Sequence, residues 1–148
     1  MIAAMAPKML ELAGAMCDGT ILWMTGPRTI EDHIIPTMAA AADKAGRPTP
    51  ATMFGLPVCV TDNADDARQR AAKDFQIYGQ LPSYRAMLDR EGAAGPADIA
   101  IIGTAAEVVA RVEALASCGA SEFAVAAFGS AEEVAATRAA LGPLAARS

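Results

Sequence analysis

The stretch that decides the fold is residues 12–36, LAGAMCDGTILWMTGPRTIEDHIIP. A helical pattern ends near Gly14, and the apolar run Thr20–Met24 follows it. A Gly-Pro turn separates this run from a second helical pattern that begins at Thr29. Because the run is too apolar to face water on either side, it is typical of a buried parallel strand. Barrels built from such strands place their functional groups at the carboxyl ends of the strands.

The same alternation of strand and helix patterns continues along the chain. Short connections between such units predict parallel neighbouring strands with right-handed crossovers. We therefore expect an α/β fold of four βα units in a single domain over residues 1–148, with a helical excursion after the third strand. The expected strands cover residues 2–5, 20–24, 53–61 and 122–127, with a further short extended run at 99–102. The expected helices cover residues 7–16, 30–45, a long region from 64 interrupted at 79–83, 104–118 and 130–142.

Several residues mark where the expected helices begin and end. Thr29 can cap the helix 30–45, and Pro36 should kink it or loosen one turn. Gly46 can supply its left-handed end, and Gly142-Pro143 should end the last helix.

Two further signals concern caps and sheet edges. The segments 104–107 and 130–133 have the Ser/Thr-x-x-Glu spacing of a capping box, in which hydroxyl and carboxylate satisfy the first free amides of a helix. Gly55 and Pro57 inside the third strand indicate a bulge or an edge strand.

Composition and charge exclude several classes of protein. A chain of this length buries roughly 70% of the surface that its unfolded form exposes. The net charge of −5 argues against a nucleic-acid binder that follows the phosphate backbone. No stretch approaches the ~18 consecutive apolar residues of a membrane span, and no basic segment precedes an apolar run at the N-terminus. Cys17, Cys59 and Cys118 are far apart and accompany one histidine, so we expect no metal site and a cytoplasmic location.

Four βα units are too few for a closed eight-stranded barrel and enough for half of one. A half-barrel has two unpaired sheet edges and an exposed apolar inner face. We therefore expect the chain either to pair with another chain or to rearrange into an open layered sheet.

Four segments resemble the second half of the luciferase-like monooxygenase family. They are AAMAPKMLELAG (3–14), DGTILWM (18–24), GLPVCVTD (55–62) and YGQLPSYRAMLDREG (78–92). The last two point to the deazaflavin-dependent branch, the F420-dependent oxidoreductases. The resemblance implies strands five to eight of a (β/α)8 barrel, a fold that typically runs to ~250 residues. It also implies hydride transfer between coenzyme F420 and an organic substrate.

The resemblance implies a site after strands five and six. A helix start after strand five would meet the anionic tail of the cofactor, although this chain has Ala6 where the family often has Gly. It leaves the catalytic residues unknown, and no metal ligand is expected. The implied cofactor contacts are Ala4, Met5, Ala6, Pro7, Lys8, Trp23 and Met24, and the implied substrate contacts are Thr25, Gly26 and Arg28. From the residues alone, three alternatives remain open: a ligand-free strand-to-helix turn at 4–8, a packed core tryptophan at Trp23, and a simple turn at 25–27.

Other residues have simpler interpretations. Cys59 is expected to be a small apolar packing residue, and His33 a surface or packing residue. Tyr78, Tyr84 and Arg85 are expected to pack on the excursion, with Arg85 paired to Asp89.

Two alternatives to the F420 hypothesis remain. The chain could belong to an FMN-dependent relative, or it could be a non-catalytic half-barrel that forms a homo-oligomer or pairs with a front-half chain. Since the front half of the family barrel supplies much of the pocket, we expect weak or no turnover from this chain alone.

Overall fold

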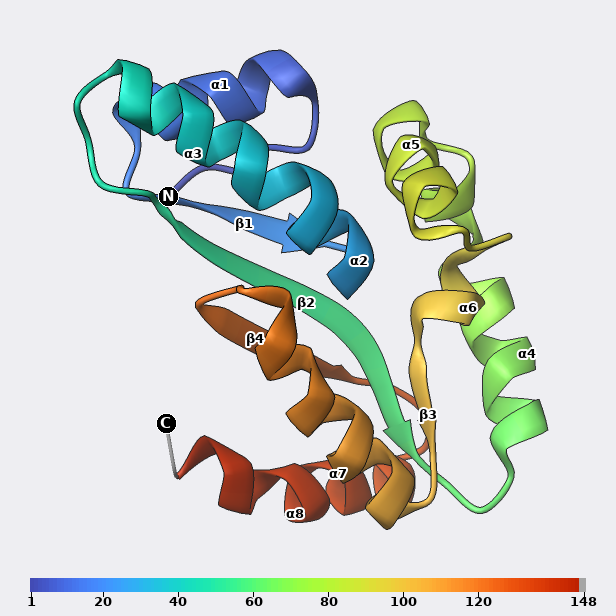
Figure 1. Cartoon of the computed structure of the whole chain (residues 1–148). Coiled ribbons are helices and arrows are strands. Elements are labelled where there is room, and N and C mark those ends of the chain that lie inside the picture. Colours follow the sequence, from blue (N-terminus) through green and yellow to red (C-terminus); the bar gives the residue numbers. More distant parts are fainter. Residues whose placement is uncertain (147–148) are drawn as a thin grey trace.

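The computed structural model describes residues 1–146, and its strands form one parallel sheet flanked by helices (Figure 1). The strands are β1 Gly19–Trp23, β2 Ala51–Val60, β3 Ile101–Gly103 and β4 Glu122–Ala127. The helices are α1 Pro7–Met16, α2 Pro27–Thr29, α3 Ile35–Lys44, α4 Ala64–Asp74, α5 Pro82–Glu91, α6 Pro96–Ile99, α7 Ala105–Ala114 and α8 Ala131–Ala145. A π-helical segment, Ile30–Ile34, joins α2 to α3, and 3-10 turns cover Gln76–Gly79 and Leu115–Cys118.

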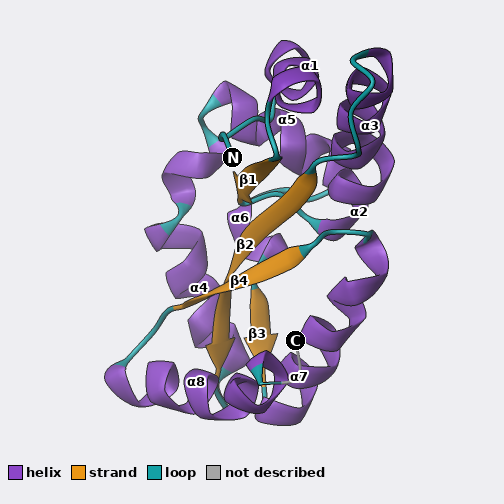
Figure 2. Ribbon diagram, turned by 90° about the vertical axis from the view of Figure 1, so that its left-hand side faces the viewer, coloured by secondary structure: helices purple, strands orange, loops and turns teal. Residues whose placement is uncertain are grey.

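Strand β2 runs through the middle of the sheet (Figures 1 and 2). Its first half pairs with β1, where Trp23 lies opposite Gly55, and its last three residues pair with β3 on the same edge. Strand β4 pairs along the other edge. Ile2 exchanges backbone hydrogen bonds with Gly19 and Ile21, on the edge of β1 away from β2. The order of Ile2, β1, β2 and β4, all parallel, is that of half a (β/α)8 barrel, as expected.

Two strand predictions need correction. The expected strand at residues 2–5 is reduced to a single bridge at Ile2. The bulge or edge expected at Gly55 and Pro57 is absent, since β2 pairs with β4 in continuous register from Met53 to Val58 and has neighbours on both edges. Pro57 is tolerated because its ring nitrogen faces the gap between the last β1 pair and the first β3 pair, where no hydrogen bond is required.

The second helical region also differs in detail from the prediction. The helix begins at Pro27 with Gly26 as N-cap, and Thr29 lies inside it rather than capping it. The π-helical turn just before Pro36 confirms the expected loosening of the helix. Gly46 has the left-handed backbone that was expected after α3 (φ 66°).

The remaining helix boundaries confirm most of the predicted signals. Both capping boxes form, Thr104 with Glu107 and Ser130 with Glu133. The expected stop at Gly142-Pro143 is wrong, because α8 continues to Ala145. Pro143 lies in the last turn, where its ring removes only one backbone hydrogen bond.

The core lies between β2 and the helices. Phe54, Leu56 and Val58 alternate along β2 and are buried against apolar residues of α1, α3 and α7. The side of β1 that carries Trp23 is more open, and Ile21 there is 48% exposed. No helix within residues 1–146 is long and apolar enough to cross a membrane.

The carboxyl end of β2 is joined to α8 by a buried threonine. The Val60 amide, beyond the last β4 pair, donates to Thr137 Oγ1 at 2.8 Å, and this hydroxyl donates to the Glu133 carbonyl at 2.7 Å. Thr137 is fully buried. Its hydroxyl therefore takes the place of a strand neighbour for the last β2 amide.

We predict that Thr137→Val lowers the free energy of unfolding by about 1–3 kcal/mol, because it buries the Val60 amide without an acceptor. Thr137→Ser is the matched control that keeps the hydroxyl. Urea unfolding of both variants measures the difference. Equal stabilities of the valine and serine variants would contradict the assigned role.

Candidate functional site

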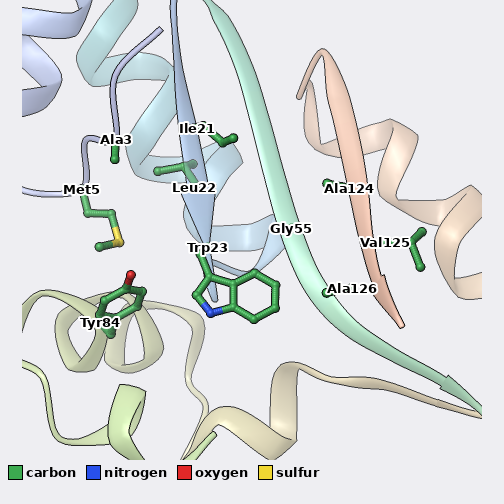
Figure 3. A pocket seen from close by; sticks show the side chains of 10 residues that line it. All are labelled: Ala3, Met5, Ile21, Leu22, Trp23, Gly55, Tyr84, Ala124, Val125 and Ala126. Atoms are coloured by element: carbon green, nitrogen blue, oxygen red, sulfur yellow. The ribbon is translucent and has the colours of Figure 1, made fainter. Parts of the chain in front are cut away.

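A cavity of about 370 Å³ opens on the sheet face that carries Trp23, a size within the usual range for small-molecule sites (Figure 3). Its lining comes from the segment before α1, from β1, β2 and β4, and from α5. The lining is almost entirely apolar. The residues are Ala3, Met5, Ile21, Leu22, Trp23, Gly55, Tyr84, Ala124, Val125 and Ala126.

An aromatic cluster forms one wall of this cavity. The Trp23 indole makes edge contacts with Phe75 and Tyr78, at centroid distances of 6.2 and 6.1 Å. Tyr78 in turn contacts Tyr84 at 4.9 Å, so the helical excursion extends the cluster to the cavity lining. Burial, and secondly Tyr78, raises the pKa of Tyr84. Its phenol therefore stays protonated at neutral pH and can donate a hydrogen bond.

Small residues form the floor. Gly55 lies in β2 between Trp23 and Ala124, its partners on the two neighbouring strands. A methyl group on Gly55 would lie 3.2 Å from an indole carbon of Trp23 and 3.3 Å from the Ala124 carbonyl oxygen. Glycine at this position lets the indole lie close to the strand and keeps the floor flat.

The residues expected after strand five, which the structure reduces to the bridge at Ile2, divide between the cavity and the core. Met5 lines the cavity, whereas Ala4 is buried, with its amide donating to Thr20 Oγ1 at 3.2 Å. Ala6, Pro7 and Lys8 follow directly as the exposed N-cap and first residues of α1.

The residues expected around strand six, which is β1, divide in the same way. Trp23 lines the cavity, but Met24 is fully buried with a left-handed backbone (φ 53°). This backbone reverses the chain at the end of β1 and is uncommon for a residue other than glycine. Thr25 is also buried, and its hydroxyl lies 3.4 Å from the Trp23 carbonyl oxygen and 3.9 Å from the Met5 sulfur.

Gly26 and Arg28 lie outside the cavity lining. The Arg28 side chain is 68% exposed and pairs with Asp32 at 3.7 Å. The amides at this helix start are occupied by the Glu91 carboxylate, which accepts from Thr29 N at 2.8 Å and from Arg28 N at 3.3 Å.

Helices α1, α2, α4 and α8 follow Ile2, β1, β2 and β4, the strands expected to be five to eight of the barrel. They differ in how their first amides are satisfied. Glu91 occupies the start of α2, and the Asn63 side chain accepts from the Asp66 amide at the start of α4. Ser130 and Glu133 close the start of α8. At α1 the N-cap is Ala6, which offers no side-chain acceptor. Among these helices of the described chain, α1 has the start most accessible to an external anion.

The start of α8 is closed by a strong ion pair. Arg70 on α4 donates two hydrogen bonds to Glu133, at 2.7 and 2.8 Å, and the Ser130 amide donates to the same carboxylate at 2.7 Å. The Arg70 hydrogen bond, followed by that of Ser130, lowers the pKa of Glu133 to about 2. (β/α)8 barrels often bind phosphate near this position, but here a carboxylate occupies it.

The two reactive side chains considered from the sequence, Cys59 and His33, are absent from the cavity lining. Cys59 is buried, and burial, followed by repulsion from Glu133, raises its thiol pKa to about 11. His33 is half-buried, and burial, then Arg90, lowers its pKa. Both fit the expected packing role, and within residues 1–146 no three His, Cys, Asp or Glu side chains gather as a metal site.

Sequence reasoning missed three kinds of site residue. Tyr84 was assigned to packing alone but lines the cavity, and its pairing with Tyr78 could have been expected only from the tertiary fold. The alternate small residues Ala124 and Ala126 on the last strand were a readable signal for an open inner face. Glu91 gave no local signal, because its partners lie more than 60 residues away in the chain.

Comparison with known proteins adds the family. The family described as luciferase-like monooxygenase matches residues 1–137. This chain belongs to that family. The 5,10-methylenetetrahydromethanopterin reductase of Methanolobus tindarius is 32% identical over 105 residues, which is 70% of this chain and 32% of the reductase. An uncharacterized protein of Mycobacterium tuberculosis is 31% identical over 97 residues, 62% of this chain and 28% of that protein.

Solved structures of this luciferase-like fold agree with the half-barrel. An F420-dependent secondary alcohol dehydrogenase superposes with a TM-score of 0.71 at 18% identity, covering 95% of this chain and 47% of that one. The coenzyme F420 dependent tetrahydromethanopterin reductase of Methanopyrus kandleri gives 0.70 at 19% identity, covering 95% and 48%. A long-chain alkane monooxygenase gives 0.62 at 15% identity, covering 97% and 40%. The chain thus spans less than half the length of each of these relatives.

The Glu133 ion pair predicts a pH dependence of stability. Its folded-state pKa of about 2 is below the ordinary value of 4.5, so its contribution is complete above pH 4.5 and is lost as the pH falls toward 2. We expect Glu133→Gln to flatten the fall in stability across this window. Glu132→Gln, exposed in the same helical turn, is the control. Urea unfolding from pH 2 to 6 measures both, and parallel curves for Glu133→Gln and the wild type would contradict the prediction.

Proposed function

We propose that this chain forms the back half of an F420-dependent oxidoreductase barrel, which transfers a hydride between the deazaflavin and a small organic substrate. The observation that carries the proposal is the flat, apolar cavity between Trp23, Met5 and the floor at Gly55. The similarity to a methylenetetrahydromethanopterin reductase and to two F420-dependent structures supports this cofactor.

The residues present fit the ring of the cofactor. A planar tricyclic ring needs an apolar slot with a flat floor, which the small residues of β2 and β4 provide, and an aromatic wall, which Trp23 provides. When bound, the deazaflavin supplies the hydride chemistry, and the protein positions it and excludes water.

The chain's own residues then have distinct proposed roles. Met5 and Trp23 contact the ring, and Ala6, Pro7 and Lys8 at the start of α1 hold the anionic tail. Ala4 and Met24, both buried, fix the backbone on either side of these contacts. We propose Thr25, Gly26 and Arg28 as the substrate-side rim, with Arg28 as an exposed charge at its outer edge.

The cavity has no opposite wall within the described residues, so we propose weak or no turnover from this chain alone. An FMN-dependent monooxygenase half is the second candidate. It is favoured by the likeness to flavin structures such as an FMN-bound Baeyer-Villiger monooxygenase component, which superposes with a TM-score of 0.57. A planar apolar slot accepts either ring.

The cofactor proposal predicts opposite effects of one substitution on folding and on binding. Ala6→Asp places a preferred capping carboxylate at the start of α1, which should stabilise the fold by about 1 kcal/mol. The same carboxylate competes with and repels the anionic tail, so F420 affinity should fall by about tenfold or more.

Thermal unfolding and a fluorescence titration with F420 measure the two effects, with Ala6→Gly as the uncharged control. Tighter binding of FMN than of F420 by the wild-type chain would favour the FMN candidate. Failure of the wild-type chain to bind either cofactor would overturn the proposed function. Unchanged F420 affinity in Ala6→Asp would show that the anionic tail does not bind at the start of α1.

A third candidate concerns assembly, in which the chain pairs through its open sheet face. Ile21 is 48% exposed on this face. Val125 is 40% exposed on the opposite face of the edge strand β4, whose outer edge is unpaired among the described residues. Exposed apolar residues on an open edge favour association with another chain.

We expect light scattering at micromolar concentration to give a mass above the 15.2 kDa of one chain. Val125→Lys should shift the mass toward the monomer, because a charge on an edge strand opposes pairing. Ile77→Lys, at a residue that is 51% exposed on the excursion, is the control. A monodisperse wild-type monomer would rule out self-association.

A further inference from the structure

Glu91, the last residue of α5, bridges two parts of the fold that are distant in sequence. One carboxylate oxygen lies 2.8 Å from the Thr29 amide and 2.7 Å from Thr29 Oγ1, and the other lies 3.3 Å from the Arg28 amide. Thr29 Oγ1 also lies 3.2 Å from the Met87 carbonyl oxygen, one turn earlier in α5. Thr29 is 1% exposed, so its bond to Met87 is buried, whereas its bonds to Glu91 are partly buried and the Arg28 amide bond is exposed.

The carboxylate completes the start of the α2 helix. The N-cap residue is Gly26, which has no side chain to accept from the first amides. Glu91 supplies the missing acceptor, and its charge is favourable at a helix N-terminus. A methyl group on Gly26 would lie 2.6 Å from Glu91 Cγ, so the close approach of Glu91 requires glycine at this position.

Both ends of this bridge lead to the cavity. Gly26 follows Trp23 by three residues at the end of β1, and α5 carries Tyr84. Tyr84 contacts Tyr78, which contacts Trp23. Trp23 is therefore connected to α5 in two ways. One runs along the chain to the α2 start and across to Glu91, and the other runs through the contacts of Tyr78 with Trp23 and with Tyr84.

We propose that Glu91 is a positioning residue, which holds Tyr84 and Tyr78 against Trp23 and thereby fixes the aromatic wall of the cavity. The identity of the ligand that binds in the cavity rests on the proposed function, but the positioning role of Glu91 does not. The fold of α5 has other anchors, since Met87 and Leu88 are buried and Arg85 donates to the Ala93 and Ala94 carbonyls. Loss of the Glu91 contacts should therefore release the aromatic cluster without unfolding the chain.

Trp23 is the single tryptophan of the chain, so its fluorescence reports on this cluster alone. The test compares acrylamide quenching in the cofactor-free full chain for the wild type, Glu91→Ala and Gly26→Ala. Both variants remove Glu91 from the helix start, one by truncation and one by steric displacement. Asp32→Asn is the control, because it removes the neighbouring Arg28 ion pair and leaves the Glu91 contacts in place.

We expect the quenching constant to rise by about twofold in both test variants and to stay unchanged in the control, since loss of local contacts increases local opening. Urea unfolding shows whether each variant is folded, and Glu91→Gln, which keeps the side-chain size, replaces any variant that is not. Equal quenching constants in all folded variants would overturn the positioning role.

A titration with F420 keeps this result separate from the proposed function. Weaker F420 binding in Glu91→Ala than in Asp32→Asn supports both. Failure of the wild type to bind F420 overturns the cofactor proposal alone, because the quenching comparison contains no cofactor.

Discussion

The double-sided pairing of strand β2 is the constraint on which the rest of the structure depends. β1 and β3 share one edge and β4 takes the other, so each of these three strands is placed by its register with β2. Its alternate residues Phe54, Leu56 and Val58 are buried against the helices, and Gly55 faces the cavity. The core and the cavity are thus the two faces of one strand. At its end, where the β4 pairing stops, Thr137 satisfies the last amide and fixes α8.

The fold was largely predictable because its signals are local. Pro7 marks the start of α1, the two capping boxes mark α7 and α8, and Gly46 marks the end of α3, each through neighbours within a few residues. The alternation of these helices with apolar runs was enough to predict a parallel half-barrel. Errors arose where a distant element intervened. Thr29 has the chemistry of an N-cap, yet Glu91, 62 residues later, supplies the acceptor and the helix starts earlier.

The candidate site was predictable only in part for the same reason. Met5 and Trp23 could be placed at strand ends, and they do line the cavity. The sequence contains no local sign that Tyr84 reaches the same cavity, because its position depends on how the excursion packs on β1. Pro57 shows the limit in another way. Its position suggested an edge, and only the stagger of β1 and β3 along β2 shows why a central strand accepts it.

The distribution of carboxylates on this acidic chain limits where an anionic ligand can bind. Each helix start can satisfy its free amides with an internal acceptor or leave them for a ligand. Glu91 at α2 and Glu133 at α8 do the former, and Glu133 is further held there by Arg70, an arrangement that depresses its pKa to about 2 and keeps it ionised. A phosphate approaching either helix would meet a fixed negative charge at the position it would occupy. At the start of α1, next to Met5 in the cavity lining, the N-cap is an alanine, and the first turn carries Lys8 and no acidic residue. The internal capping therefore favours the α1 end of the cavity for an anionic tail and leaves the apolar floor for a ring.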